Sequence, residues 1–140
     1  MEPLPTGLGD LDLHAVRVRP TRGAREHRQW DRLVARHHYL SFDGLFGKAL
    51  RHVATLGETW IALVGWQAAA LKLGARDRWI GWSAQQKLRR LHLVIQNSRF
   101  VILPDWHVRN LASRVLGLSL RRLSDDMLAT HGFPVLLAEA

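Results

Sequence analysis

The order of apolar and polar positions predicts an antiparallel front half for this chain. Residues 11–18 alternate between apolar and polar side chains, a spacing typical of a half-buried strand. In residues 24–38 the apolar positions recur with a helical period, which predicts an amphipathic helix. Residues 48–56 and 59–67 are rich in β-forming residues and are separated by a Gly-Glu pair, so they predict a β-hairpin.

The pattern is less regular in the middle of the chain. Residues 68–73 could extend the second hairpin strand into a short helix. Two glycines bracket residues 74–82, which predicts a loop. Ser83 is a favourable N-cap for a helix that runs to residue 93, because Gln86 stands at the capping-box spacing from it.

The back half predicts a strand, a loop, a long helix and a second strand. Residues 100–103 form a short apolar run, as expected for a strand that is covered on both faces. Asp105 is a favourable N-cap for the next helix, whose apolar band extends over residues 108–127. Gly132 fits the position just after that helix, and residues 133–138 predict the last strand. The complete order of elements predicts an α+β fold, a mixed sheet with flanking helices.

Composition indicates one globular domain and excludes several classes of protein. A chain of 140 residues, 47% hydrophobic and 23% charged, is long enough to bury a core. We expect residues 1–10, rich in Pro and Gly, to be a disordered lead-in and residues 11–140 to form a single domain. The absence of cysteine excludes disulfides and Cys-based zinc or thiol chemistry. No apolar run approaches the roughly 20 residues needed to span a bilayer, and the N-terminus does not resemble a signal peptide, so we expect a cytoplasmic protein without membrane contact.

The chain is strongly basic, with a net charge of +8 and a pI near 11.4. This balance favours an anionic partner such as nucleic acid, a phosphorylated cofactor or anionic lipid. Because 17 of the 20 basic residues are Arg, the codon bias of a GC-rich genome is a second explanation. Four arginines of the first predicted helix share a stripe that either meets phosphates or faces solvent, namely Arg25, Arg28, Arg32 and Arg36.

Arg76, Asp77, Trp79 and Trp82 form a compact polar and aromatic cluster, and we take all four as candidate ligand-binding residues. An arginine beside an exposed tryptophan can contact phosphates while the indole stacks on a base. The alternative is a loop network between Arg76 and Asp77, with the tryptophans packed in the core. Six tryptophans in 140 residues favour core packing for most of them.

Three further candidates flank the elements of the back half. Asn97 and Arg99 precede the central strand predicted at residues 100–103, and Arg99 could face the same cleft as the loop after Leu103. Structural hydrogen bonding is the alternative for both residues. Glu139 ends the last predicted strand, where α/β sites collect carboxylates, although its penultimate position also exposes it to fraying.

The order of elements resembles the N-terminal and central part of the acyl-CoA N-acyltransferase (GNAT-like) fold. In that fold the fourth strand, a phosphate-binding loop, a long helix and the fifth strand form the cofactor-binding core. The corresponding loop here offers Arg109, Asn110 and Ser113 to an anion, but it has no glycine and carries the negative charge of Asp105. The alternative is that Asp105 caps the helix and the other residues make local contacts. We therefore expect no cofactor, and acyl-CoA is the candidate that the resemblance raises.

Five short motifs occur in order between residues 30 and 139: HHYL, RDRWIGW, NSRFVILP, NLAS and FPVLLAE. Together they resemble the DruA family of the Druantia anti-phage system, whose members occur in bacterial defence islands and near mobile elements. The resemblance implies a role in anti-phage defence, with other defence-system proteins as partners. Family members continue past the position of Glu139 into a segment of the form GTxYxAxNW. The resemblance therefore also implies a C-terminally truncated chain, which lacks the last helix and strands of a GNAT-like fold and whose unpaired last strand promotes association.

No motif assigns a reaction to this chain. The eight histidines show no metal-ligand spacing, and neither a nucleophile elbow nor a P-loop pattern is present. We expect no metal site, and the catalytic residues stay unassigned. Three functions are open: a DruA-like defence component that engages nucleic acid or another anion through a basic cleft, a GNAT-like acyltransferase or a degenerate relative of one, and a DNA-binding accessory protein of a mobile element.

Overall fold

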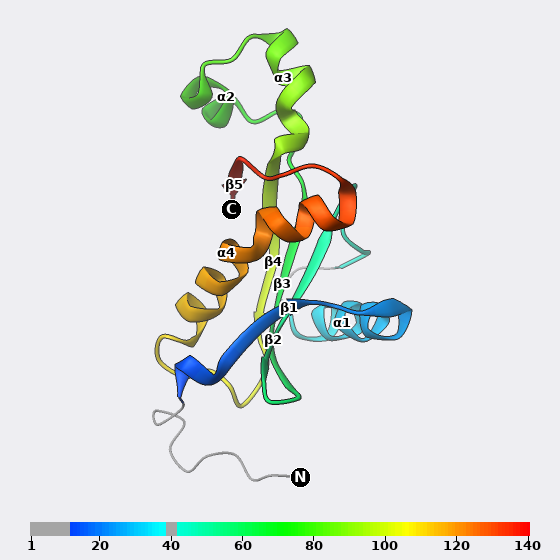
Figure 1. Ribbon diagram of the computed structural model, residues 1–140, viewed down its shortest axis with the longest axis vertical. Helices are drawn as coiled ribbons and strands as arrows, with labels where there is room; N and C mark the ends of the chain where they lie inside the picture. The colour runs from blue at the N-terminus through cyan, green and yellow to red at the C-terminus, as the bar shows by residue number, and fades with distance from the viewer. Residues whose placement is uncertain (1–11, 39–41) are drawn as a thin grey trace.

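A computed structural model describes residues 12–38 and 42–140. The predictions for residues 1–11, and for the last two residues of the HHYL motif, lie outside the described residues. The described residues form one five-stranded sheet with the strand order β1-β2-β3-β4-β5 (Figure 1). The strands are β1 (Val16–Pro20), β2 (Leu50–Leu56), β3 (Thr59–Ala68), β4 (Val94–Ile102) and β5 (Leu137–Glu139). The described helices are α1 (Gly23–His37), α2 (Gly74–Ile80), α3 (Ala84–Arg90) and α4 (Leu111–His131), with short 3-10 turns at η2 (Leu13–Ala15) and η3 (Leu91–Leu93).

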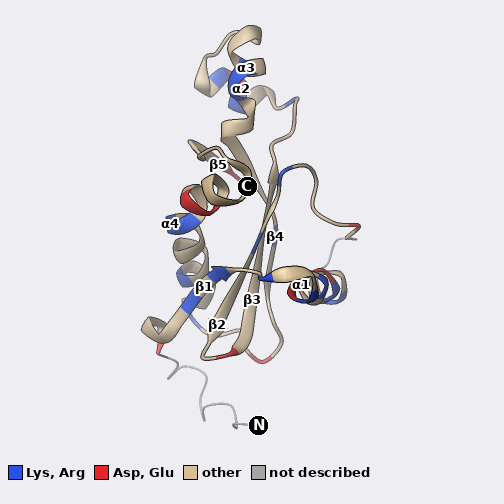
Figure 2. Ribbon diagram, turned by 45° about the vertical axis from the view of Figure 1, so that its right-hand side comes forward, with Lys and Arg blue, Asp and Glu red and all other residues tan. Residues whose placement is uncertain are grey.

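The sheet is mixed. β1, β2, β3 and β4 are antiparallel neighbours, whereas β5 runs parallel to β4 after the chain has crossed through α4. The helices α4 and α1 lie on opposite sides of the sheet (Figure 2). The predicted mixed α+β fold class is confirmed, and the strand order places β1 and β5 at the two edges.

The central strand β3 is buried on both faces, which explains its consecutive apolar residues. Residues 61–66 are all buried. On the α1 side the ring of Trp30 packs so closely on Gly65 that a Cβ there would lie 2.8 Å from the ring. On the α4 side the indole of Trp66 donates a hydrogen bond to Ser119 at 2.9 Å. A larger residue in place of Gly65 would therefore push α1 away from the sheet.

Local signals in the sequence predict several elements correctly. The hairpin of β2 and β3 and the helix α1 are confirmed to within a few residues. Ser83 and Gln86 make both bonds of the capping box, at 3.1 and 2.8 Å. Gly132 ends α4 in the left-handed conformation with φ of 86°, as predicted for that position.

The prediction of a loop over residues 74–82 is wrong, because residues 74–80 form α2. Gly81 has φ of 75° and its N–H bonds to the carbonyl of Asp77 at 2.9 Å. The glycine therefore ends a helix instead of marking a loop. The short helix suggested for residues 68–73 is also wrong, since β3 ends at Ala68 and the next residues are irregular.

The strand boundaries of the back half also differ from the prediction. β4 begins at Val94, six residues early, because antiparallel pairing with β3 draws the polar residues 96–98 into the sheet. β5 is shorter than predicted and begins at Leu137. Phe133, predicted as strand, instead packs edge-on against the ring of His92 with centroids 5.1 Å apart. Tertiary packing overrides the local strand preference in both places.

No helix in the described ranges combines the length and the apolar character that crossing a membrane requires. Among the same residues, no three His, Asp or Glu side chains are grouped closely enough to hold a metal ion.

Candidate nucleic-acid interface

The segment between β3 and β4 forms an arm that projects beyond the sheet (Figure 1). We define the arm as residues 70–93, which contain α2, the turn Gly81-Trp82-Ser83 and α3. The left-handed glycine ends α2 and the capping box starts α3, so local sequence determines both helix ends. Two helices joined by a short turn that contains glycine have the outline of a helix-turn-helix unit.

The carboxylate of Asp77 holds the two helices of the arm together. It accepts hydrogen bonds from the guanidinium of Arg76 and the indole of Trp82, each at 3.0 Å, and from the ammonium of Lys87 at 2.6 Å. The hydrogen bond from Lys87 is the largest influence on its pKa, which falls to about 2 despite an opposing effect of burial. Asp77 is the one acidic residue in the sequence of the arm, and its charge is neutralised inside the arm.

Arg76 anchors the arm to the edge of the sheet. Its side chain is only 3% exposed and donates to the carbonyl of Ala70 at 2.6 Å and to the carboxylate of Glu139 in β5 at 3.1 Å. The structure thus brings together four of the predicted site residues, Arg76, Asp77, Trp82 and Glu139. Because Arg76 is buried and bonded to Asp77, Ala70 and Glu139, these contacts serve as a clamp, and Arg76 is closed to an external ligand.

The outward surface of the arm is basic and apolar. The arm contains six Lys or Arg residues and one Asp, a net charge of +5 out of +8 for the whole chain. Four of these cations are exposed and form no salt bridge with a described residue: Lys72, Arg78, Arg89 and Arg90. Trp79 and Leu88 are 77% and 78% exposed, and Figure 2 shows the basic residues gathered on α2 and α3. Sequence reasoning selected Trp79 and missed the four cations, although the density of charge over residues 72–90 was available as a signal.

A second basic surface lies on α1. The stripe of Arg25, Arg28, Arg32 and Arg36 is exposed along its whole length. Two carboxylates on the same helix pair with arginines of the sheet, Glu26 with Arg19 and Asp31 with Arg51. None of the exposed large hydrophobic residues belongs to α1, so this surface offers charge without an aromatic group.

Asn97 and Arg99 lie at a bulge in β4. The register with β3 shifts there, so that Ser98 has no partner residue. The side-chain amide of Asn97 spans the bulge, donating to the carbonyls of Gly65 at 3.0 Å and Arg99 at 3.1 Å. The guanidinium of Arg99 lies 5.5 Å from the ring centre of Phe42 on the α1 side. These contacts show that both predicted site residues have structural roles, and that they lie apart from the arm.

The loop between β4 and α4 corrects the role predicted for Asp105. It is not the N-cap of α4, which begins six residues later, after Asn110. Asp105 and Asn110 have φ of 74° and 68°, and they are the only non-glycine residues in the described part of the chain with positive φ. The loop takes this path because Trp106 and Leu111 are both buried, at 9% and 0% exposure. Asn and Asp tolerate this conformation better than other residues with a Cβ.

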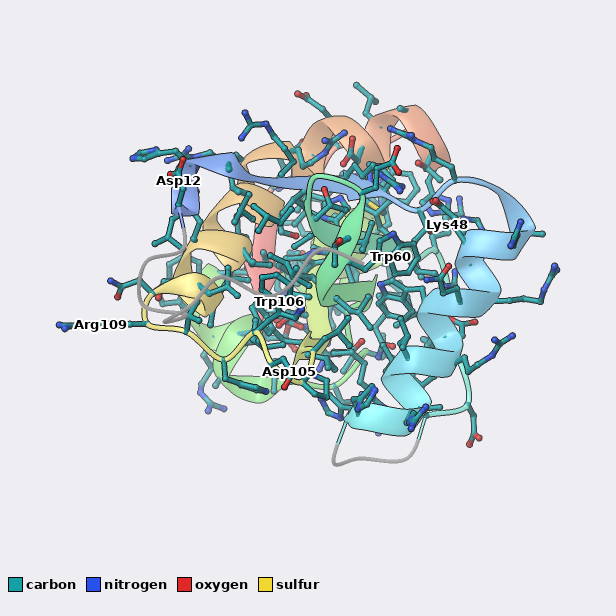
Figure 3. All side chains as sticks on the ribbon, turned by 90° about the horizontal axis from the view of Figure 1, so that it is seen from below. Asp12, Lys48, Trp60, Asp105, Trp106 and Arg109 are labelled. Carbon is teal, nitrogen blue, oxygen red and sulfur yellow. The ribbon has the colours of Figure 1, made fainter. Side chains whose placement is uncertain are left out.

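The three anion-binding candidates of the same loop do not converge on one site. Arg109 points away from the body of the protein into solvent (Figure 3). Asn110 and Ser113 are exposed and make no side-chain cap on α4. The loop therefore offers one extended cation and two separate polar groups.

A buried polar network connects α4 to the sheet, and no sequence pattern indicated it. Ser119 is hydrogen-bonded to Nδ1 of His52 at 2.6 Å, and Nε2 of His52 lies 2.8 Å from the carboxylate of Asp126. Arg122 bonds the same carboxylate at 2.6 Å. The three types of side chain are those of a Ser-His-Asp triad, but Ser119 is 0% exposed, so no substrate reaches its hydroxyl in this conformation.

The donors and acceptors of this network determine its protonation. The carboxylate of Asp126 can only accept, so the ring proton of a neutral His52 is on Nε2 and is donated to it. Nδ1 then accepts from the hydroxyl of Ser119, whose oxygen in turn accepts from the indole N–H of Trp66. Burial lowers the pKa of His52 more strongly than the neighbouring carboxylate raises it, so the ring stays neutral in the folded protein. Burial raises the pKa of Asp126, but the hydrogen bonds from His52 and Arg122 outweigh it and lower the pKa.

The fold and the arm define a class of protein: a mixed α+β domain with a basic, aromatic helical arm inserted between two central strands. The sequence profile of the family described as Druantia protein DruA matches residues 10–138. Because this match spans nearly the whole 140 residues, the chain belongs to the DruA family, and the resemblance carried by the five motifs is confirmed. No curated protein and no solved structure matches the chain.

Proposed function

We propose that this chain is a component of anti-phage defence that binds nucleic acid through the outward surface of its arm. Membership of the DruA family supports the defence role. The observation that carries the binding role is the group of four exposed cations on the arm without a salt-bridge partner among the described residues. An unneutralised cluster of this kind attracts a polyanion and releases its counterions on binding.

The size of the electrostatic effect follows from the number of cations. Each phosphate contact contributes about 0.7 to the slope of log affinity against log salt for single strands and about 0.9 for duplexes. Four contacts therefore give a slope of about −3 to −4, so raising salt from about 50 to 200 mM should weaken binding by about 50- to 150-fold. Asp77 is paired with Lys87 and Arg76, so its charge is already neutralised by cations other than these four.

The test uses fluorescence anisotropy of a labelled oligonucleotide titrated with the full chain at several salt concentrations. We compare the triple variant Arg78→Gln, Arg89→Gln, Arg90→Gln with the wild type. The variant should bind weakly and lose about 2 to 3 from the magnitude of the salt slope. Retention of wild-type affinity and slope by this variant would exclude the arm as the binding surface.

The stripe on α1 supplies a matched control. The triple variant Arg25→Gln, Arg28→Gln, Arg32→Gln removes the same charge from an exposed surface that has no aromatic group. If only total charge matters, the two variants should weaken binding equally. If the arm is the interface, the α1 variant should lose much less affinity than the arm variant.

A GNAT-like acyltransferase, or a degenerate relative of one, is the second candidate function. The parallel pairing of β4 and β5 through α4, which is the order the GNAT-like resemblance implies, favours it. The loop that would hold the cofactor phosphates offers Arg109 but also carries the negative charge of Asp105. Thermal stabilisation of the protein by acetyl-CoA, with none by oligonucleotides, would favour this function over the first.

A DNA-binding accessory role in a mobile element would use the same surface of the arm. This accessory role predicts that the protein prefers one DNA sequence, since it must recognise the sequence at the ends of the mobile element. Equal affinity for unrelated DNA of the same length would therefore count against it.

A further inference from the structure

Trp79 is the exposed tryptophan of the arm. Its side chain is 77% exposed, although an indole of this size is usually largely buried. Arg76 and Trp82, each three positions away in the sequence, are differently placed, because Trp82 donates to Asp77 and Arg76 is buried in the clamp. Arg78, directly before Trp79, is exposed. The end of α2 thus presents one free indole face next to one free guanidinium.

The indole is held on a rigid support. α2 ends at Gly81 in a left-handed cap, and the carboxylate of Asp77 joins α2 to α3 through Lys87. The clamp between Arg76 and Glu139 joins the same helix to the sheet. An aromatic group presented in this way loses little conformational freedom when it binds, which favours stacking on a flat partner.

The arm is poorly equipped to read the edges of paired bases. α3 has seven residues, a length of about 10 Å, and the apolar Leu88 takes up part of its exposed surface. The amide of Gln86 is occupied in the capping box, which leaves Gln85 as the one exposed amide of the helix without such a bond. Direct readout of adenine in the major groove relies on such amides and readout of guanine uses arginine, so this short helix offers a narrow set of base contacts. A free indole among cations instead matches the requirements of an unpaired strand, whose bases stack and whose phosphates are neutralised.

We infer that the arm binds single-stranded nucleic acid in preference to duplex, with Trp79 stacked on an unpaired base and Arg78, Arg89 and Arg90 on the flanking phosphates. This inference rests on the proposed nucleic-acid function and names its substrate class. The binding is tolerant of sequence, because every base offers a face for stacking and the remaining contacts are to the backbone. Trp79 supplies affinity that salt does not weaken, while the three arginines supply the salt-dependent part.

The experiment measures the anisotropy of three labelled ligands with the full chain: an oligothymidine, a duplex of equal length, and an abasic strand with the same phosphates and no bases. Wild type should bind oligothymidine most tightly. Trp79→Ala should weaken that binding by about 5- to 150-fold, the equivalent of one stacked base, and should leave the salt slope unchanged. Trp79→Phe should retain part of the affinity. The Trp79→Ala variant should also bind oligothymidine and the abasic strand equally. Without the indole, the bases of oligothymidine have no stacking partner and add nothing to the affinity.

The outcomes separate this inference from the function on which it rests. No binding of any ligand would overturn both. Equal binding of duplex and single strand, unchanged in Trp79→Ala, would overturn the inference and leave the basic arm as a binding surface. Because Trp79 and Leu88 could also insert into a membrane surface, vesicles with anionic headgroups are tested by sedimentation. Vesicle binding that is lost in Trp79→Ala, without any binding of oligothymidine, would assign the arm to a membrane and overturn the proposal.

Discussion

Replacing Ser119 with Ala should destabilise the protein far more than the same change at Ser113 on the same helix. The hydroxyl of Ser119 satisfies two groups at once, the indole N–H of Trp66 and Nδ1 of His52. Both partners are at most 1% exposed, so no water can replace the lost oxygen without entering the core. Ser113 is exposed, and its hydroxyl is hydrated when the protein is folded and when it is unfolded.

The magnitude follows from the cost of leaving two buried groups without a partner. Each such group costs about 1–3 kcal/mol, so Ser119→Ala should lower the free energy of unfolding by about 2–6 kcal/mol. That is a large share of the roughly 5–15 kcal/mol expected for a domain. The gain in helix propensity from Ser to Ala, about 0.5 kcal/mol or less, applies equally to Ser113→Ala and cancels in the comparison.

Urea denaturation followed by circular dichroism measures both variants against wild type. A difference between the two variants below about 1 kcal/mol would refute the reasoning that the network is buried and satisfied. A double variant sharpens the test. Trp66→Phe removes one of the two orphaned partners, so adding it to Ser119→Ala should cost less than the sum of the single changes, with a coupling of about 1 kcal/mol.

Three other changes test separate parts of the structure. Because burial holds the pKa of His52 below its usual 6.5, the unfolded chain takes up a proton there before the folded protein does. Stability should therefore be fully present above about pH 6.5 and decline as the pH falls below it, which urea midpoints at two pH values would measure. Asn110→Ala should destabilise by about 1 kcal/mol while Asn110→Gly stays close to wild type, because φ of 68° disfavours a Cβ. Arg76→Ala should cost about 3–5 kcal/mol by leaving the carboxylate of Glu139 without its partner, with Arg78→Ala within about 0.5 kcal/mol of wild type.

Each of these expectations has a result that contradicts it. Equal urea midpoints at pH 7.5 and 5.5 would mean that His52 is protonated as easily in the folded state as in the unfolded chain. Greater stability of Asn110→Ala than of Asn110→Gly would show ordinary backbone at this position, where alanine is preferred. Equal losses in Arg76→Ala and Arg78→Ala would show that the clamp between the arm and β5 does not form.

The candidate site was predictable where it depends on neighbours along the chain. The grouping of Arg76, Asp77 and Trp82 was visible in the sequence because these residues occupy one helix and the turn after it. The structural role of these residues was not visible in the sequence. Whether an arginine is buried in a clamp or exposed to a ligand depends on the position of β5, and Arg76 and Arg78 differ in this respect although only one residue separates them. Asn97 likewise attracted attention as a polar residue near the central strand, but only the register of β3 and β4 reveals the bulge that it spans.

The sequence by itself determined the family, the basic charge, the periodic elements and the helix ends made by Ser83, Gln86 and Gly132. These features arise from interactions between residues a few positions apart, so the local order of side chains is sufficient to specify them. The tertiary structure decided which distant polar groups meet. Ser119 and Asp126 lie 67 and 74 positions from His52, and they reach it only because α4 packs across the sheet in one register. The same packing leaves Trp79 and its neighbouring cations outside the core, since the arm extends beyond the strands that could have covered them (Figure 1).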